Sequence, residues 1–325
     1  MRLRTLIDNI NYVELVNMDN MSDEIMGISY NSKKTAPNDL FICLTGEHVD
    51  GHEYAEEAFD NGAIAFVVER RLNLDAPQIV VENTSEIIAQ ISDFFFGSPS
   101  QKLNVIGVTG TNGKTTVSNM INDVLEDNGY KVINNRYGSN MNTGIAASFV
   151  NNNTITGKNT KDIAVFEMDE RSTIHIFKYI TPTYLVCNNL SRDSLKRNAH
   201  TAFIAGIINN AIPKATTVIT NGDDPICVNL ASENKKIYFG IDRLDTDTEK
   251  CENIVQDMVL CPKCGTKLEY EYYRYHHVGK MKCPNCGFGT PKRDYETTKI
   301  DFENKLVTIK DNDKNTEYSY SMVAD

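Results

Sequence analysis

The chain has 325 residues, a formal net charge of −11 and no basic run, so nucleic acid is not expected as its main partner. No apolar run approaches the length of a membrane span, and the first residues, Met-Arg-Leu-Arg-Thr-Leu-Ile, lack the apolar core of a signal peptide. We therefore expect a cytoplasmic protein without a membrane span, and the length predicts two domains of ordinary size or three small ones.

The first part of the chain alternates strand and helix signals from about residue 24 to residue 96. Strands are predicted at 41–44, 63–68 and 78–81, and helices at 54–61 and 85–95. Gly-Ser-Pro-Ser-Gln-Lys at 97–102 is typical of a linker. We therefore predict a small N-terminal α/β domain over residues 1–98 and a second domain over residues 99–325.

The second domain continues the alternation of strands and helices. Its strands are predicted at 105–108, 131–133, 163–166, 184–187, 217–219 and 237–239. Strands that alternate with helices indicate a mostly parallel sheet covered on both faces, with ligands at the carboxyl ends of the strands. From about residue 257 the character changes, and three short antiparallel strands are predicted at 294–301, 306–310 and 317–321.

The most informative segment is Gly107-Val-Thr-Gly-Thr-Asn-Gly-Lys-Thr-Thr116, between an apolar run and a helical pattern. A glycine-rich turn between a strand and a helix directs backbone N–H groups at one point, which attracts phosphate. Lys114 is expected to reach the β- and γ-phosphates of a nucleotide, and the Thr115 hydroxyl to bind Mg²⁺. Val108 stands where the full pattern has its first glycine. The alternative is a glycine turn that binds no ligand.

Two Cys-x-x-Cys-Gly units predict a metal site of four thiolates, Cys261, Cys264, Cys283 and Cys286. Their spacing is that of a zinc ribbon, which we place at residues 257–290 as an insertion in the second domain. Four thiolates close a tetrahedral Zn²⁺ shell and leave no open position for water, so the predicted role is structural. Between the pairs we predict an antiparallel hairpin, and His276 and His277 are not expected to be ligands.

The phosphate loop and its neighbours resemble the Mur ligases, ATP-dependent enzymes that extend or amidate peptidoglycan precursors. The resemblance rests on residues 108–116, on Asn188-Asn-Leu-Ser-Arg-Asp193, on Asn221-Gly-Asp-Asp-Pro225 and on Glu167 after a predicted strand. It implies Lys114 and Glu167 as catalytic residues, and Thr115 and Glu167 as Mg²⁺ ligands. The ATP-binding residues that it implies are Gly110, Thr111, Asn112, Gly113, Lys114, Thr115, Thr116, Asn189, Arg192, Asn221 and Asp224.

Two branches of the family are similar to different parts of the chain. The N-terminal region resembles the UDP-MurNAc-binding domain of MurE through Asn31-Ser-Lys33, Pro37-Asn-Asp-Leu-Phe41, Asp50-Gly-His52 and Gly62-Ala63. This implies that Ser32 and Lys33 bind the substrate, although MurE usually has Asp-Ser-Arg there. The central region resembles MurT, which amidates the D-Glu of lipid II, through Phe166-Glu-Met-Asp-Glu170, Tyr137-Gly-Ser-Asn-Met141 and the inserted ribbon.

The resemblance implies that a peptide carboxylate attacks the γ-phosphate of ATP, and that an amine or ammonia then displaces phosphate. The substrate is a UDP-MurNAc-peptide or lipid II, and a MurT-like chain implies a glutaminase (GatD-like) subunit as partner. Three hypotheses stay open: MurT-like amidation, MurE-like addition of an amino acid, and a non-catalytic nucleotide-binding subunit or fragment. Mur ligases have a C-terminal domain that is apparently missing here, so we expect the chain alone to be a poor ligase.

Overall fold

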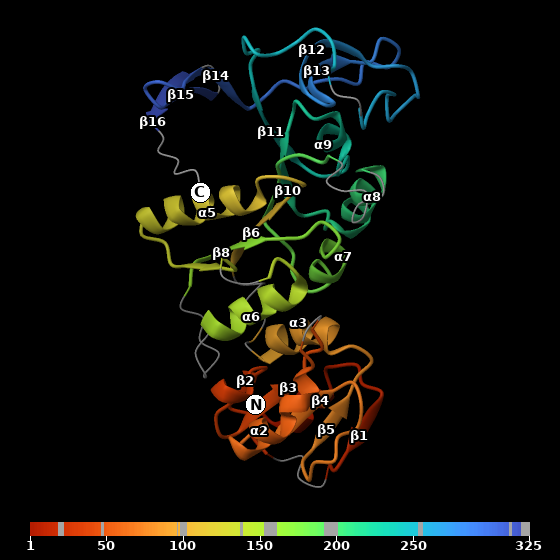
Figure 1. Ribbon diagram of the computed structural model, residues 1–325, viewed down its shortest axis with the longest axis vertical. Helices are drawn as coiled ribbons and strands as arrows, with labels where there is room; N and C mark the ends of the chain where they lie inside the picture. Colours follow the sequence, from red (N-terminus) through yellow and green to blue (C-terminus); the bar gives the residue numbers. More distant parts are fainter. Residues whose placement is uncertain are drawn as a thin grey trace. The chain divides into compact units, whose positions relative to one another are not determined.

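The computed structural model of the protein (Figure 1) contains several helices and strands joined by loops. It describes residues 1–18, 23–46, 49–95, 97, 103–136, 139–152, 161–191, 201–252, 256–311 and 314–319. The helices are α1 (Leu3–Ile7), α2 (Ala55–Asp60), α3 (Thr84–Phe95), α5 (Lys114–Asp127), α6 (Asn142–Asn152), α7 (Thr173–Ile176), α8 (Thr201–Ala211) and α9 (Pro225–Asn229), with 3-10 helices η1 (Ser32–Lys34) and η2 (Gly51–Tyr54).

The strands fall into three sheets. They are β1 (Glu14–Val16), β2 (Gly27–Ser29), β3 (Asp39–Ile42), β4 (Ala65–Val68), β5 (Gln78–Val80), β6 (Asn104–Thr109), β7 (Val132–Asn134), β8 (Ile163–Glu167), β9 (Tyr184–Cys187), β10 (Thr217–Asn221), β11 (Lys236–Ile241), β12 (Glu269–Tyr275), β13 (Val278–Lys282), β14 (Tyr295–Asp301), β15 (Leu306–Asp311) and β16 (Lys314–Ser319).

The N-terminal sheet has five strands in the order β1-β5-β4-β3-β2. Its strands pair in parallel except for β1, which runs antiparallel to β5. Every residue of β3 and β4 is buried, because apolar side chains cover both faces of the sheet. One face packs with α1 and α3 through residues such as Leu6, Leu40 and Ile88, and the other packs with α2 through residues such as Ala58 and Phe66.

The second sheet has nine strands in the order β16-β15-β14-β11-β10-β9-β6-β8-β7. Parallel pairing joins β6 to β9, β9 to β10, β10 to β11 and β7 to β8. The predicted α/β fold with mostly parallel sheets is thus confirmed. The three C-terminal strands pair antiparallel with one another, as the sequence predicts. In addition, β14 pairs in parallel with β11 and so extends the large sheet, which the sequence did not indicate.

The predicted hairpin between the cysteine pairs is present as β12 and β13, the two antiparallel strands of the third sheet. The ribbon, residues 257–290, therefore lies in the connection between β11 and β14 (Figure 1). Its apolar cluster is small and consists of residues such as Leu268, Met281 and Phe288 beside two of the cysteines.

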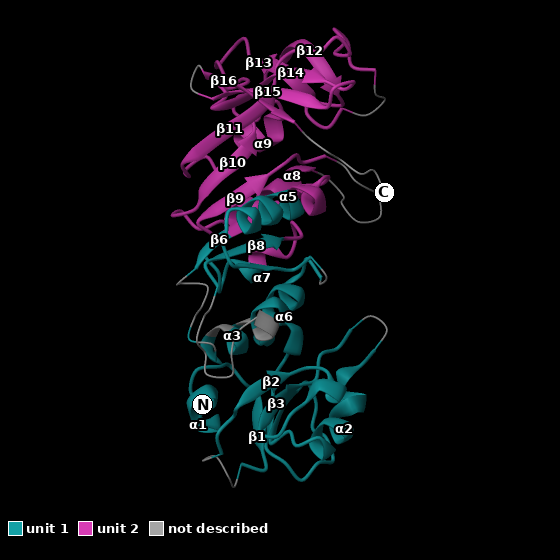
Figure 2. Ribbon diagram, turned by 90° about the vertical axis from the view of Figure 1, so that its left-hand side faces the viewer, with its two compact units in different colours: residues 1–105, 118–167, 175–181 teal, residues 106–117, 168–174, 182–325 magenta. Residues whose placement is uncertain are grey.

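The chain forms two compact units that interleave along the sequence (Figure 2). Unit 1 comprises residues 1–105, 118–167 and 175–181, and unit 2 comprises residues 106–117, 168–174 and 182–325. Unit 1 extends beyond the linker because α6 packs on α3: Asn142 Nδ2 donates to the Ser85 carbonyl at 2.6 Å. The domain boundary at residue 98 stays a prediction.

None of the helices in the described ranges is both long enough and apolar enough to cross a membrane.

Candidate nucleotide and metal sites

The phosphate loop joins the end of β6 at Thr109 to the start of α5 at Lys114, which confirms the strand–loop–helix arrangement predicted from the sequence. Gly110 and Gly113 have φ angles of 123° and 77°, in the region that favours glycine. A Cβ atom on Gly110 would lie 2.8 Å from the carbonyl oxygen of Asn189. The glycine at position 110 is therefore required both by the backbone turn and by the close approach of the neighbouring segment.

The segment that follows β9, Asn188 to Ser191, holds the loop in place. The Thr111 N–H donates to the Asn189 carbonyl at 2.7 Å, and the Asn112 N–H donates to Asn189 Oδ1 at 3.2 Å. The Thr111 hydroxyl donates to the Ser191 carbonyl and accepts from the Ser191 N–H, both at 2.9 Å. Asn189 and Thr111, both predicted to bind ATP, thus contact each other. Arg192, from the same motif, lies outside the described residues.

The ammonium group of Lys114 forms hydrogen bonds with oxygen atoms of the loop and of Glu170. Its Nζ donates to the carbonyl oxygens of Gly110 at 2.6 Å and Thr111 at 3.3 Å. It also forms an ion pair of 3.0 Å with Glu170 Oε1. Burial raises the pKa of Glu170 above the ordinary value of a glutamate, and the nearby Lys114 ammonium opposes this shift. No sequence pattern predicts this contact, because the two residues are far apart in the chain.

The expected Mg²⁺ ligands lie at the start of α5 and at the end of β8. Thr115 and Thr116 are exposed at the start of α5, as are Asn112 and Gly113. Glu167 ends β8, where Asn135 holds its backbone with two hydrogen bonds of 2.9 Å. Its carboxylate accepts from Asn140 Nδ2 at 3.1 Å, so one oxygen is oriented by the protein.

The segment Asn221-Gly-Asp-Asp-Pro225 follows β10 and begins α9. Asn221 Oδ1 accepts from the Asp223 N–H at 2.9 Å. Asp224 is fully buried and caps α9 by accepting from the Ile226 N–H at 2.8 Å. Burial disfavours its charge, but contacts with His277 and with backbone N–H groups outweigh this and lower the pKa of Asp224. The Asp224 carboxylate is therefore not exposed to a ligand.

The predicted substrate-binding pair, Ser32 and Lys33, forms η1 of the N-terminal sheet region. The Ser32 hydroxyl is buried and donates to Glu57 Oε2 at 2.5 Å. Lys33 is exposed, and its backbone N–H donates to Asn31 Oδ1 at 3.1 Å. Asn31 thus caps η1, and Lys33 alone of the pair offers its side chain to solvent.

The nearby motif Asp50-Gly-His52 forms a polar cluster after β3. The buried His52 places Nδ1 2.6 Å from Asp50 Oδ1 and accepts from the Glu69 N–H at 2.9 Å through Nε2. Arg70 NH2 donates to Asp50 Oδ2 at 2.7 Å. The hydrogen bond from Arg70 and that from the His52 N–H lower the pKa of Asp50. The motif therefore stabilises the loop through its own contacts.

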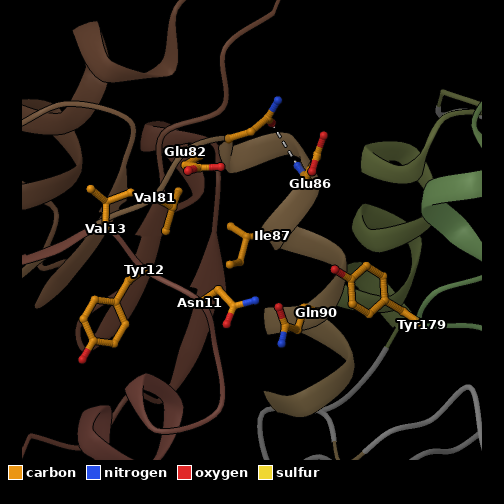
Figure 3. Close-up of a pocket in the computed structure, with 10 residues that line it drawn as sticks. Asn11, Tyr12, Val13, Val81, Glu82, Glu86, Ile87, Gln90 and Tyr179 are labelled. Carbon is orange, nitrogen blue, oxygen red and sulfur yellow. Dashed lines mark hydrogen bonds between the residues drawn. The ribbon is translucent and has the colours of Figure 1, made fainter.

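A cavity of about 510 Å³ lies in unit 1 beside α3 (Figure 3). Figure 3 shows Glu82, Glu86, Gln90 and Tyr179 around it, and its walls include neither Ser32 nor Lys33. The carboxylates of Glu82 and Glu86 disfavour a phosphate ligand by charge repulsion. We do not assign this cavity to the nucleotide sugar.

The cysteines predicted to bind a metal converge. The sulfur atoms of Cys261, Cys264, Cys283 and Cys286 all lie within 4.8 Å of one another. The Cys261–Cys286 and Cys264–Cys283 pairs are each separated by 3.5 Å between sulfurs. A tetrahedral Zn²⁺ with Zn–S bonds of about 2.3 Å separates its sulfurs by roughly 3.8 Å, so the four thiols fit this ion.

Two of these thiols differ in how readily they lose a proton. Hydrogen bonds with the side chain and backbone of Thr266 lower the pKa of Cys264 to about 6. The Phe288 backbone N–H favours the Cys286 thiolate, but desolvation and the neighbouring thiols raise its pKa to about 12. Four thiolates at this spacing would repel one another, and a bound metal ion would stabilise them together.

Comparison with known proteins identifies two family domains in the chain: the Mur ligase middle domain matches residues 108–281, and the Mur ligase family catalytic domain matches residues 24–95. The chain is 34% identical over 217 residues to the MurT subunit of lipid II isoglutaminyl synthase from Streptococcus pneumoniae, which covers 66% of this chain and 48% of that protein. It is 44% identical over 106 residues to the UDP-N-acetylmuramoyl-L-alanyl-D-glutamate–2,6-diaminopimelate ligase of Listeria monocytogenes, which covers 33% of this chain and 22% of that protein. In both alignments, the chain spans less than half the length of the relative.

Solved structures of the same fold cover nearly the whole chain. MurF from Acinetobacter baumannii matches 97% of this chain and 59% of its own, with a TM-score of 0.68 at 17% identity. MurF from Thermotoga maritima, solved in complex with ADP, matches 90% of this chain and 58% of its own, with a TM-score of 0.62 at 20% identity. Because the middle domain alone accounts for more than half of the sequence, the chain belongs to the Mur ligase family of ATP-dependent amide-bond ligases.

Proposed function

We propose that the chain binds ATP at residues 110–116 and takes part in amide-bond formation on a peptidoglycan precursor. The observation that carries the proposal is the phosphate loop itself, which is held by Asn189 and Ser191 and presents Lys114 beside exposed residues of α5. Family membership supports the same chemistry. A substrate carboxylate attacks the γ-phosphate of ATP to give an acyl phosphate and ADP, and an amine or ammonia then displaces inorganic phosphate.

In this proposal the residues of the chain position charge rather than form covalent bonds. The loop N–H groups and the start of α5 bind the phosphates, and Lys114 exchanges part of its contact with Glu170 for a γ-phosphate oxygen. Thr115 and Glu167 would hold Mg²⁺, which when bound offsets the charge that the transferring phosphoryl group develops. Asn135 and Asn140 hold the backbone and one carboxylate oxygen of Glu167 in place.

Among family members we propose MurT-like amidation of the D-Glu of lipid II, with ammonia from a glutaminase (GatD-like) subunit. The 34% identity to MurT over 217 residues supports this, and so does the inserted four-cysteine ribbon. We propose that this ribbon holds one structural Zn²⁺. We also propose a cytoplasmic location, as the sequence predicts.

A second candidate is MurE-like addition of an amino acid to a UDP-MurNAc-dipeptide. The 44% identity to a diaminopimelate ligase over 106 residues favours it, as does Lys33, which is exposed where a nucleotide sugar is expected. A third candidate is a nucleotide-binding subunit that lacks turnover of its own. The three differ in the product formed, so one set of assays separates them.

The test is calorimetric titration of the full chain with Mg·ATP, followed by product mass analysis with lipid II plus ammonia and with UDP-MurNAc-dipeptide plus amino acids. Lys114→Ala should lose transition-state stabilisation of about 3 kcal/mol wherever turnover exists, as expected for one preorganised charge contact. Lys214→Ala is the matched control, because Lys214 pairs only with Glu233 at the surface among the described residues. Equal binding and equal turnover in wild type and Lys114→Ala would refute the site.

Product identity decides between the candidates. Amidated lipid II, together with a glutaminase that co-purifies, supports the MurT-like reaction. A lengthened UDP-MurNAc-peptide supports the MurE-like reaction. ATP binding without either product, with the chain alone and with a supplied C-terminal domain, supports the non-catalytic subunit.

A further inference from the structure

Two consecutive carboxylates, Asp223 and Asp224, lie between the phosphate loop and the ribbon within unit 2. Neither is more than 1% exposed. Burial of adjacent negative charges is costly unless each is paired and hydrogen-bonded. The hydrogen bonds and ion pairs of the two carboxylates therefore indicate which parts of the fold they connect.

Asp224 is connected to the phosphate loop through one residue. Its Oδ2 accepts from the Leu190 N–H at 2.8 Å. Leu190 stands between Asn189 and Ser191, the two residues that hold Thr111 and Asn112 of the loop. The Asp224 carboxylate is thus connected to the loop by a short series of hydrogen bonds through Leu190 and its two neighbours.

On its other side Asp224 meets the ribbon through His277. This histidine forms the turn between β12 and β13 and is fully buried. Its Nε2 lies 3.3 Å from Asp224 Oδ1, and its Nδ1 lies 3.9 Å from Asp257 Oδ2. The Tyr270 hydroxyl donates to the His277 carbonyl at 3.2 Å, which fixes the turn. The imidazole is therefore held between two carboxylates and is oriented by the hairpin.

Asp223 meets the same hairpin at a second point. Arg274, on β12, places NH1 2.9 Å from Asp223 Oδ2, and Arg293 places Nε 2.9 Å from Oδ1. The Gly279 N–H, on β13, donates to the Asp223 carbonyl at 2.8 Å. The ribbon hairpin thus contacts both the side chain and the backbone of Asp223. The adjacent Asp224 contacts Leu190, in the segment that holds the phosphate loop.

We propose that the ribbon braces the nucleotide site: it fixes the phosphate loop through His277 and the Asp223–Asp224 pair, so that Zn²⁺ at the four cysteines strengthens ATP binding. His277 is a positioning residue in this scheme and does not contact the nucleotide. The inference rests on the proposed ATP site at residues 110–116. The contacts from hairpin to loop run through a closely packed interior, which transmits small shifts: Asp223 pairs with Arg274 and Arg293, and His277 Nε2 lies 3.3 Å from Asp224 Oδ1.

The first test titrates the zinc-loaded full chain, wild type and variants, with Mg·ATP by calorimetry. We expect His277→Ala to weaken ATP affinity about tenfold, a size typical of coupling between two sites. His277→Gln should lie within about threefold of wild type on the same scale, because its amide N–H can still donate to Asp224. Val278→Ala is the matched control: it removes buried apolar volume beside His277 and should lower the melting temperature without changing ATP affinity.

Equal ATP affinity in His277→Ala and wild type would overturn the inference, as would an equal loss in Val278→Ala, because either result leaves no specific role for the Asp224 contact. A wild-type chain that fails to bind Mg·ATP would overturn the proposed function and this inference together. Normal wild-type binding with an unaffected His277→Ala variant overturns the inference alone, so the two failures are distinguishable.

The second test needs no variant of the ribbon to fold. Coupling is reciprocal, so saturating Mg·ATP must strengthen Zn²⁺ retention by the same factor by which Zn²⁺ strengthens ATP binding. Zinc transfer from the wild-type chain to a chromogenic chelator is measured with and without Mg·ATP. Free nucleotide can itself chelate zinc. The Lys114→Ala variant controls for this, because it is exposed to the same Mg·ATP concentration but is expected to bind the nucleotide only weakly. Unchanged zinc retention in wild type would overturn the inference.

Discussion

The five-stranded sheet of unit 1 and the ribbon of unit 2 obtain their stability from different sources. In the sheet, every residue of β3 and β4 is buried among apolar side chains. In the ribbon, each strand has both buried and exposed residues, and the apolar cluster includes two of the cysteines. The sheet therefore depends on area removed from water, whereas we expect the ribbon to depend on a bound metal ion and on ion pairs. Removing the metal and removing apolar volume should therefore affect the stability of the two regions independently.

The largest effect is expected when the metal is removed. Chelation or Cys283→Ser should abolish hydrogen-exchange protection over β12 and β13, because metal binding to a thiolate site provides folding free energy of about 10–16 kcal/mol in small zinc domains. Protection of β3 and β4 should be unchanged. Cys251→Ser is the control, since Cys251 lies outside the four-thiol cluster. A hairpin that stays equally protected without metal would contradict the comparison.

A cavity in the sheet should have the next largest effect. Phe66 is fully buried, and its ring lies 6.0 Å from that of Phe41. Phe66→Ala should lower the free energy of unfolding of unit 1 by about 3–5 kcal/mol, with or without chelator. Urea denaturation followed by circular dichroism measures it. Phe302→Ala, at a residue that is 77% exposed, should change little. If the effect of Phe66→Ala depended on the chelator, the stability of the sheet would depend on the metal site, which would contradict the comparison.

A smaller effect is expected at the phosphate loop, where polar contacts rather than apolar burial set the geometry. Glu170→Gln removes the anion that pairs with Lys114. We expect Mg·ATP to bind about fivefold more tightly, roughly 1 kcal/mol, because the ammonium is released for the phosphates. Titration calorimetry checks this, with Glu233→Gln at a surface ion pair as control. Weaker binding would show that Glu170 supports the loop more than it competes with phosphate.

The smallest effect concerns pH and the polar cluster after β3. The pKa of Asp50 is lowered, chiefly by the hydrogen bond from Arg70. A carboxyl whose pKa is lower in the folded state stabilises the protein above its unfolded pKa of about 3.9, and this stabilisation is lost as pH falls below that value. Asp50→Asn should therefore flatten the acid side of the stability curve of unit 1. Identical acid limbs in thermal melts from neutral to acid pH would exclude this contribution.

What the sequence could predict was local. The phosphate loop, the cysteine spacing and the hairpin between the cysteine pairs each depend on residues close together in the chain, and each is present. Conversely, the Lys114–Glu170 pair and the His277–Asp224 contact join residues far apart, where no periodicity or spacing points from one to the other. The sequence interpretation of His277 as a non-ligand stays a prediction, and its burial between two carboxylates was not foreseen.

The difference between local patterns and distant contacts also applies to the predicted substrate-binding residues. A motif predicts that Ser32 and Lys33 lie near a ligand, but it does not say which atoms remain available. Glu57, which takes the Ser32 hydroxyl, is on α2 and outside the motif. Likewise Asp224 matches a nucleotide-binding pattern, yet helix capping and His277 occupy its oxygens. Patterns locate a site, whereas the packing of distant elements decides what each side chain does there.

The pairing of β11 with β14 has a consequence for how the ribbon could be changed. The two strands are parallel neighbours, with Phe239 opposite Tyr295. Parallel neighbours cannot be joined by a tight turn and need a crossover of about a dozen residues or more, usually a helix. Here the ribbon is part of that crossover. A shortened chain therefore cannot join β11 to β14 with a two-residue loop; it needs a replacement connection that runs from the carboxyl end of β11 back to the amino end of β14.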